Sequence, residues 1–249
     1  MQQRPWHGGP HREHAANGGD HRSTITRTST TVYLSSPGPS PTGAMKSYPS
    51  IKQFRQDRHA NFVGHTFAKI DGSNLRFEWE KKKGWFRFGS RRRLLDESHD
   101  EFGMAMDLFR NNFADEFAKL AVQSNWNSIM VFCEFWGAKS FAGQHEESDP
   151  KFLTPIDVAI YKKGLLASAE FVQHFENKFD IGYLGTRTWD DHFVQSVIGS
   201  TLPDMAFEGV IGKSGSGHKQ LAIKLKSQAW KDKVLQKYGE VEGQKIIES

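Results

Sequence analysis

This chain has few of the residues that hold small secreted domains together. It contains a single cysteine, Cys133, among 249 residues, so it can form neither an internal disulfide nor a cysteine-based zinc site. That absence favours a reducing, cytoplasmic compartment. No apolar run approaches the roughly 20 residues that a membrane helix needs, and the N-terminus lacks the layout of a signal peptide. We therefore expect neither secretion nor a membrane partner.

Charge is also only slightly one-sided, with 33 Lys and Arg against 29 Asp and Glu and a net charge of +4. A mildly basic balance suits a polyanionic partner such as nucleic acid without establishing one. Aromatic side chains are plentiful by contrast. The 19 phenylalanines indicate a core built more from aromatic than from aliphatic residues, in a chain long enough for one or two domains.

Aliphatic residues are almost missing from residues 1–44. This segment holds five of the nine prolines and eleven Ser or Thr residues, so it cannot bury enough apolar surface to offset the entropy of ordering. We expect 1–44 to be a disordered tail, or sequence upstream of the true start at Met45. Residues 45–249 are then the folded domain.

Hydrophobic periodicity predicts the main elements of that domain. Apolar residues alternate with charged ones over 75–79, which indicates a half-buried strand, and 85–88 is the return strand of a hairpin turned at Lys81–Lys83. Aromatic residues recur every three or four positions over 101–122, which predicts one amphipathic helix begun by acidic residues near 96–101. We also expect strands at 129–135, 156–161, 209–212 and 221–225, and helices at 168–176, 188–198 and 229–248.

These elements are mixed and do not alternate strictly, which favours an α+β fold over a doubly wound parallel sheet. No internal repeat is visible. The sequence therefore predicts one catalytic or binding domain rich in antiparallel strands.

Lys69 begins the most informative segment, Lys-Ile-Asp-Gly-Ser-Asn, directly before a strand. A lysine is a nucleophile only when deprotonated, so its pKa of about 10.4 must be lowered by burial or by nearby cations. Lys224 and Lys226 could supply those cations. Their i, i+2 spacing on a strand places both on one face, although alternating lysines also occur on solvated strand faces.

Two acids and a basic run complete the pattern. Glu134 lies inside an apolar strand, where a carboxylate is costly unless it has a partner or a task. Glu208 begins a second short apolar strand. Arg91 to Arg93 follow the predicted hairpin and could equally be a solvated basic run.

In this order the motifs resemble those of the covalent lysyl-adenylate nucleotidyltransferases. They read Lys-x-Asp-Gly-x-Asn, Ser-Arg, Glu in a strand ending Trp-Gly, Ile-Asp-Val, Glu-Gly-Val-Ile and Lys-x-Lys, from about residue 60 to 232. That superfamily comprises ATP-dependent DNA ligases, RNA ligases and mRNA capping enzymes. Asn74 stands where DNA ligases usually have arginine, so the chain is more similar to the RNA ligases that seal breaks in duplexes. The resemblance implies an ATP-grasp-like nucleotidyltransferase fold.

The resemblance also implies a role for each site residue. Lys69 would attack the α-phosphorus of ATP and carry AMP, while Asp71 and Asn74 would orient it and the metal-bound phosphate, unless they serve only the turn. Arg91, or Arg92 if the loop shifts by one, would contact the ribose and later the donor phosphate. Glu134 would bond the ribose hydroxyl and Glu208 would lie near Mg²⁺. Lys224 and Lys226 would hold the α-phosphate as pyrophosphate leaves.

Two details depart from known motifs. The family has an aromatic residue before the Ile-Asp-Val strand that stacks on adenine, but Pro155 and Ile156 stand there, which leaves Phe152 as a candidate. Gly212-Lys213-Ser214 ends like a phosphate-binding P-loop, but Phe207 occupies the position of the first glycine. We therefore dismiss a P-loop.

Residues 227–249 are too few for the OB-fold or helical domain that follows the last lysine pair in related enzymes, so we expect no OB-fold domain here. The function implied is an ATP-dependent RNA ligase that uses ATP and Mg²⁺, acts on nicked duplexes or RNA ends and is a monomer. A DNA nick ligase is the alternative within the enzyme class. A ligase descendant that binds nucleic-acid ends without sealing them is the alternative outside it.

Overall fold

The computed structural model describes residues 47–248 except 92, 100, 139 and 141–144. The segment 1–44, for which disorder is predicted, lies outside the described residues. Within them strands and helices are mixed, which confirms the expected α+β class. None of the described helices is long and apolar enough to cross a membrane.

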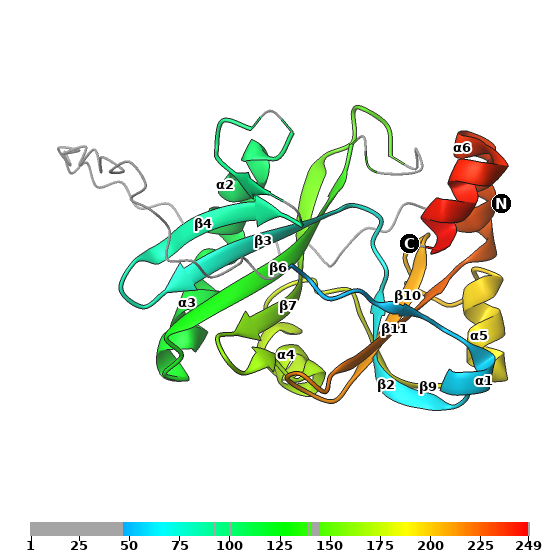
Figure 1. Cartoon of the computed structure of the whole chain (residues 1–249), viewed down its shortest axis with the longest axis horizontal. Coiled ribbons are helices and arrows are strands. Elements are labelled where there is room, and N and C mark those ends of the chain that lie inside the picture. Colours follow the sequence, from blue (N-terminus) through cyan, green and yellow to red (C-terminus); the bar gives the residue numbers. More distant parts are fainter. Residues whose placement is uncertain (1–46, 92, 100, 139, 141–144, 249) are drawn as a thin grey trace, which may run out of the picture.

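A six-stranded sheet forms one half of the fold (Figure 1), in the order β5-β4-β3-β6-β7-β8. Its described strand pairs are all antiparallel. The predicted hairpin is confirmed as β3 and β4, which turn at Lys81–Lys83. The strands are β3 (Ser73–Glu80), β4 (Gly84–Ser90), β5 (Leu94–Leu95), β6 (Ser128–Gly137), β7 (Lys151–Ile160) and β8 (Gly164–Leu165).

A five-stranded sheet forms the other half, in the order β1-β11-β10-β2-β9. Among the described strands only β1 and β11 pair in parallel. Periodicity missed β2, which pairs with β10, and β9, which is the edge strand beside β2. The strands are β1 (Lys52–Gln53), β2 (Phe62–Ala68), β9 (Tyr183–Trp189), β10 (Gly209–Ser214) and β11 (Leu221–Lys226).

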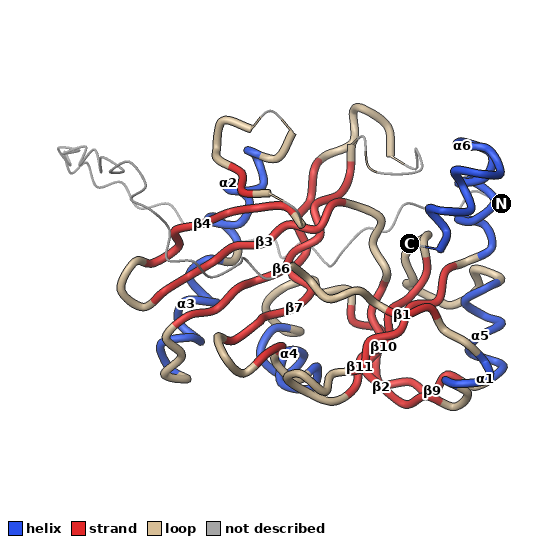
Figure 2. Tube along the Cα trace, viewed as in Figure 1, coloured by secondary structure: helices blue, strands red, loops and turns tan. Residues whose placement is uncertain are grey.

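Figure 2 shows that the helices divide between the two sheets. Three lie along the six-stranded sheet, where α2 and α4 pack on β7 and α3 packs on β6. α5 packs on the five-stranded sheet. The helices are α1 (Gln56–His59), α2 (Gly103–Asn112), α3 (Ala114–Gln123), α4 (Ser168–Phe175), α5 (Asp191–Ile198) and α6 (Gln228–Glu248).

The single helix expected over 101–122 is wrong, because α2 and α3 are separated at Phe113. The backbone of Phe113 has φ −131° and ψ −33°, outside the helical region. The acidic start is also wrong, since the first turn of α2 holds no acid. The aromatic periodicity survives the break because Phe109 and Phe117 both reach the same core, and Phe77 stacks on Phe109 at 3.9 Å between ring centroids.

Strand β3 is not half-exposed as its alternation predicts. Arg76 and Glu78, on the face away from the aromatic core, are both buried. Arg87 on β4 forms an ion pair with Glu78 at 2.5 Å, and Arg76 donates to the carbonyl of Arg91. Charged residues on a strand therefore mark a covered polar face here, which the two-residue period cannot distinguish from a solvated one.

A buried polar triad joins the two sheets. Lys213 on β10 donates to the Oδ2 atom of Asp157 on β7 at 2.8 Å, and the hydroxyl of Tyr48 donates to the same oxygen at 2.5 Å. The ammonium of Lys213 also donates to the carbonyl of Ile156 and lies over the ring of Phe67. Lys213 is thus a strand residue that holds the sheets together, and the dismissal of a P-loop at this position stands.

The C-terminal helix α6 is kinked. Gly239 has φ 74° and ψ 172°, and the part that follows it folds back so that Gly243 lies against Leu235. Trp230 and Val234 are buried in a small cluster of their own, against which Phe207 and Ile246 pack. This returning arm, residues 240–248, brings the last turn of α6 next to Lys226 at the end of β11.

Candidate active site

A cavity of about 840 Å³ is lined by residues of both sheets, of the loop between β2 and β3, and of α6. Its volume lies in the range of small-molecule sites. Eight of the nine residues predicted from the sequence line it: Lys69, Asp71, Asn74, Arg91, Glu134, Glu208, Lys224 and Lys226.

Lys69 lies at the centre of this group. Its backbone N–H donates to the carbonyl of Gly209, which ties the β2–β3 loop to the start of β10. Its ammonium lies 2.7 Å from Oε1 of Glu208, and both side chains are largely buried. The residues that precede β10 therefore supply the closest charge partner of Lys69.

The expectation that cations lower the pKa of Lys69 is wrong for the ligand-free protein. Burial does lower it, but the charge and hydrogen bond of Glu208, with smaller contributions from Glu134 and Asp71, raise the pKa of Lys69 above its usual value. Together these acids, Glu208 above all, outweigh the effect of burial on the Lys69 pKa. The ammonium form of Lys69 is the resting form.

Two glycines allow these loops to approach the strands so closely. A Cβ atom on Gly72 would lie 2.5 Å from the carbonyl oxygen of Phe135 on β6. Gly209 has φ 140°, and a Cβ there would lie 2.1 Å from the carbonyl oxygen of Leu225 on β11. Only glycine fits either position. The Asp-Gly and Glu-Gly pairs in the sequence thus place both acids at the cavity wall.

Glu134 faces the cavity from β6, paired across the strands with Asn74 on β3. Burial raises the pKa of Glu134 to about 8, Glu208 and Asp71 add to the shift, and Lys69 and the Asn74 side-chain hydrogen bond oppose it. Glu134 therefore holds a proton at neutral pH in the ligand-free protein. A protonated carboxyl can donate as well as accept a hydrogen bond.

Asp71 is held from outside its own loop. The indole N–H of Trp230 on α6 donates to Oδ2 of Asp71 at 2.9 Å. Burial and then Glu208 raise the pKa of Asp71 to about 6, whereas Trp230, Lys69 and Lys226 lower it. Asp71 is consequently ionised for the most part at neutral pH.

Lys224 and Lys226 share the cavity face of β11, as their spacing predicts. Both are buried, at 6% and 4% exposure, so they are not a solvated strand face. Burial lowers the pKa of Lys224, and it lowers the pKa of Lys226 to about 8 with help from Lys69 and Lys224 against Glu208. The two ammonium groups therefore bring positive charge into the same cavity that Asp71, Glu134 and Glu208 line.

Lys226 is further tied to the end of α6. Its ammonium donates to the carbonyls of Ile246 and Ile247, lies 3.7 Å from Glu208 and sits 4.6 Å from the ring centroid of Trp230. Carbonyls in the last turn of a helix carry partial negative charge. They partly compensate the burial of this lysine.

Arg91 lines the cavity at its open side and donates to the hydroxyl of Ser50 at 3.3 Å. Arg93 also lines it. The alternative residue, Arg92, lies outside the described residues. Two residues of the basic run after β4 therefore line the cavity.

The expectation that Phe152 stacks on a base is not supported by the geometry. Phe152 does not line the cavity and stacks instead on Trp136, with ring centroids 4.6 Å apart. Ile156, at the β-bulge where the pairing of β7 with β6 shifts register, lines the cavity. Ile51, Ile156 and Ile211 provide apolar wall in its place.

Sequence reasoning missed two contributors. Residues 48–51, before β1, line the cavity, yet they read as an ordinary chain start. Trp230 was expected only as a packing residue of the last helix. No local pattern distinguishes a tryptophan that packs from one whose N–H reaches a distant carboxylate. The position of Trp230, four residues after Lys226, is the one sequence feature that indicates that it lies near the site.

Carboxylate oxygens, which Mg²⁺ prefers as ligands, are present, but they do not form a complete set of protein ligands for an ion. Asp71, Glu134 and Glu208 line one cavity, while no cluster of three or more acids, histidines or cysteines among the described residues is arranged to hold an ion. Mg²⁺ is commonly bound by one or two carboxylates together with substrate phosphates and water. The donor set fits that kind of site.

No protein-family model and no curated protein matches this sequence. Solved structures do. A Naegleria gruberi RNA ligase variant with AMP and manganese matches 75% of this chain and 57% of its own, at 14% identity and a TM-score of 0.53. The same ligase with pyrophosphate matches 78% and 58%, at 15% identity and a TM-score of 0.51.

An archaeal ATP-dependent RNA ligase matches 77% of this chain and 51% of its own, at 11% identity and a TM-score of 0.55. This chain thus spans little more than half the length of these ligases. The resemblance expected from the motifs is confirmed at the level of the fold. The described part of this chain has the fold of the adenylyltransferase domain of RNA ligases.

Proposed function

We propose that this protein is an ATP-dependent polynucleotide ligase that joins 3′-hydroxyl and 5′-phosphate ends of RNA through a lysyl-AMP intermediate. The observation that carries the proposal is the meeting of Lys69 with Glu134, Glu208, Lys224 and Lys226 in one cavity. Nucleotidyl transfer needs a nucleophile and cationic groups that bind a polyphosphate. Lys69 can serve as the nucleophile, and Lys224 and Lys226 can bind the phosphates.

In the first step neutral Lys69 attacks the α-phosphorus of ATP. A nitrogen–phosphorus bond forms, the bond from that phosphorus to the leaving pyrophosphate oxygen breaks, and one proton of the attacking amine passes to solvent. Lys69 becomes nucleophilic when its ammonium loses the Glu208 partner, since the strongest influence that raises its pKa is then gone and burial favours the neutral amine. Lys224 and Lys226 stabilise the charge that develops on the phosphates.

Glu208 is the residue that we expect to hold Mg²⁺, with the phosphates as further ligands. When bound, the ion supplies neutralisation of phosphate charge. In this proposal protonated Glu134 bonds the ribose hydroxyl, and the Ile156 and Ile211 side chains, which line the same cavity, contact the base. Asn74 fixes Glu134 through its side-chain hydrogen bond.

Two further transfers complete sealing. A 5′-phosphate oxygen attacks the AMP phosphorus and releases Lys69, and a 3′-hydroxyl then attacks the activated 5′-phosphate and releases AMP. Arg91, at the open side of the cavity, is placed to contact the donor phosphate. The exposed turn Lys81–Lys83 would add sequence-independent phosphate contacts that weaken with salt.

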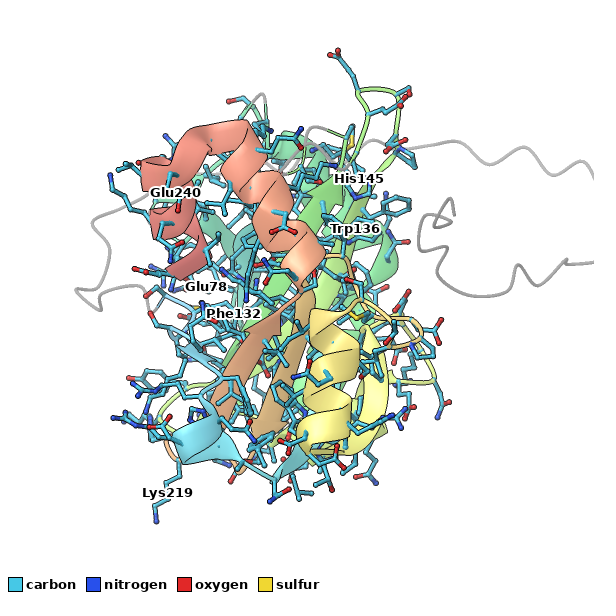
Figure 3. The ribbon with its side chains drawn as sticks, turned by 90° about the vertical axis from the view of Figure 1, so that its right-hand side faces the viewer. Glu78, Phe132, Trp136, His145, Lys219 and Glu240 are labelled. Carbon is cyan, nitrogen blue, oxygen red and sulfur yellow. The ribbon has the colours of Figure 1, made fainter. Side chains whose placement is uncertain are left out.

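The primary test is transfer of label from α-labelled ATP to the protein in the presence of Mg²⁺. Wild type should acquire covalent label that acid releases, and K69A and K69R should acquire none. K219A is the matched control, because Lys219 projects from the far end of the β10–β11 hairpin, away from α6 (Figure 3). Unlabelled wild type would refute the enzyme proposal, and equal label on K69A would refute the nucleophile.

Substrate is tested separately on nicked duplexes with RNA or DNA on either side of the break. Joining that requires an RNA 3′-hydroxyl strand supports the RNA ligase proposal, whereas equal joining of all-DNA nicks supports a DNA ligase. Binding of ends without label or joining would identify a non-sealing protein. Residues 45–249 alone should label like the full chain if they are one catalytic domain.

A further inference from the structure

We propose that Trp230 is a positioning residue of the nucleotide site, whose indole holds Asp71 and Lys226 in their working orientation. The inference rests on the proposed function and deepens it, because it gives α6 a part in the adenylylation site. The sequence predicts this helix but gives it no part in that site.

The indole makes a different contact with each of two site residues. Its N–H donates to Oδ2 of Asp71 at 2.9 Å, while its ring centroid lies 4.6 Å from Nζ of Lys226. A cation over an indole face is attracted by the ring, more strongly when both are desolvated. Trp230 is only 2% exposed and Lys226 only 4%, so both contacts are shielded from water.

The start of α6 fixes the position of this indole. The backbone N–H of Trp230 donates to the hydroxyl of Ser227, which is the cap of the helix, and that hydroxyl donates to the carbonyl of Phe207. The N–H of Ser227 donates to the carbonyl of Glu208. The tryptophan is therefore anchored to the chain segment that carries the acid partner of Lys69.

Packing holds the rest of the side chain. Trp230 and Val234 form a buried cluster against which Phe207 and Ile246 pack, the latter from the returning arm of α6. The indole has little freedom to turn. Its N–H is thus directed at Asp71 by structure that exists before any nucleotide binds, which is how a supporting residue lowers the cost of organising a site.

The N–H matters because the other groups around Asp71 have opposing effects on its charge. Burial and Glu208 favour the protonated acid, whereas Lys69, Lys226 and the Trp230 N–H favour the carboxylate. Deleting the N–H alone removes one of the stabilising groups and leaves the ring in place. The groups that face Asp71 from the packed elements are Lys69 in its own loop, Glu134 on β6, Glu208 before β10, and Lys226 on β11.

The test compares Trp230→Phe with Trp189→Phe across pH. Trp189 is an equally buried indole whose N–H donates to Thr66 at 3.0 Å in the five-stranded sheet, outside the cavity lining. Trp230→Phe should shift the acid limb of lysine adenylylation upward by about one pH unit, with a loss of about fivefold at pH 6 that disappears above pH 8. Trp189→Phe should keep the wild-type pH profile.

A second readout does not depend on activity. The indole Nε1–H NMR signal that Trp230→Phe removes should titrate with the acid of Asp71 in wild type, and Asp71→Asn should abolish that titration. A Trp230→Phe enzyme with a wild-type pH profile, or an indole signal unaffected by Asp71→Asn, would overturn the inference. If wild type takes no label from ATP, the proposed function fails and the NMR titration alone decides the role of Trp230.

Discussion

The ammonium of Lys69 lies 2.7 Å from the carboxylate of Glu208, with 18% and 5% of the two side chains exposed. The proposed nucleophile is therefore paired, charged and unreactive until that carboxylate is engaged elsewhere. This arrangement protects the lysine from side reactions in the absence of nucleotide. If Lys69 is the nucleophile, as we propose, a ligand that engages Glu208 would release it from this pair.

Glu208→Gln should make Lys69 more reactive at neutral pH. Without the Glu208 charge, the largest influence that raises the Lys69 pKa is gone and burial lowers it, so more of the amine is neutral. We expect at least about tenfold faster modification at pH 7 by an amine-directed ester, measured on the Lys69 peptide by mass spectrometry. Glu80→Gln, which breaks the exposed pair with Lys83, is the control. An unchanged rate in Glu208→Gln contradicts the coupling.

The titration of Glu134 should make the free energy of unfolding fall as pH rises. Its pKa is about 8 in the folded protein against 4.5 for an ordinary glutamate, so between these values the folded state keeps a proton that the unfolded state has released. Its stabilising contribution is complete below pH 4.5 and is lost as pH rises through 8.

Glu134→Gln removes this titration. Relative to wild type, its free energy of unfolding should gain at least about 1 kcal/mol between pH 5 and pH 8, measured by urea denaturation. Glu240→Gln, on the exposed returning arm of α6 (Figure 3), should follow wild type at both values. A constant difference between Glu134→Gln and wild type would show that Glu134 is ionised in the folded protein.

Alanine substitutions of Ile156 and Phe152 should differ in their effect on the KM for ATP. Ile156→Ala removes apolar wall from the cavity and should raise the KM for ATP in self-adenylylation by about tenfold, in line with a lost side-chain contact. Phe152→Ala should leave that KM unchanged, since its ring lies on Trp136 outside the cavity lining. The reverse result would restore Phe152 as the stacking residue.

Asp157→Asn should be strongly destabilising. The Lys213–Asp157 pair is 3% and 1% exposed, and loss of one partner leaves the other charge buried and unpaired. The expected cost is about 3–5 kcal/mol in the free energy of unfolding, measured with denaturant. Adding Lys213→Met should recover part of it. Glu242→Gln, in an exposed pair with Lys245, should leave the midpoint unchanged.

The two-residue and four-residue periods predicted most elements because they reflect burial against a single neighbouring layer. The β3–β4 hairpin and β11 follow from the alternation, whereas β6 follows from a continuous apolar run of strand length. The periods fail to predict the structure where a strand is covered on both faces, and where a helix is interrupted although its apolar pattern continues. Arg76 and Glu78 are covered on the polar face of β3, and Phe113 interrupts a continuous aromatic stripe between α2 and α3.

The sequence by itself determined which chemical groups are available and which share a strand face. Lys224 and Lys226 point to one side because side chains alternate along any strand. Only the tertiary structure decided which groups meet. Charge states depend on distances of a few ångströms between residues far apart in the chain, so Glu208 sets the form of Lys69 and Trp230 reaches Asp71.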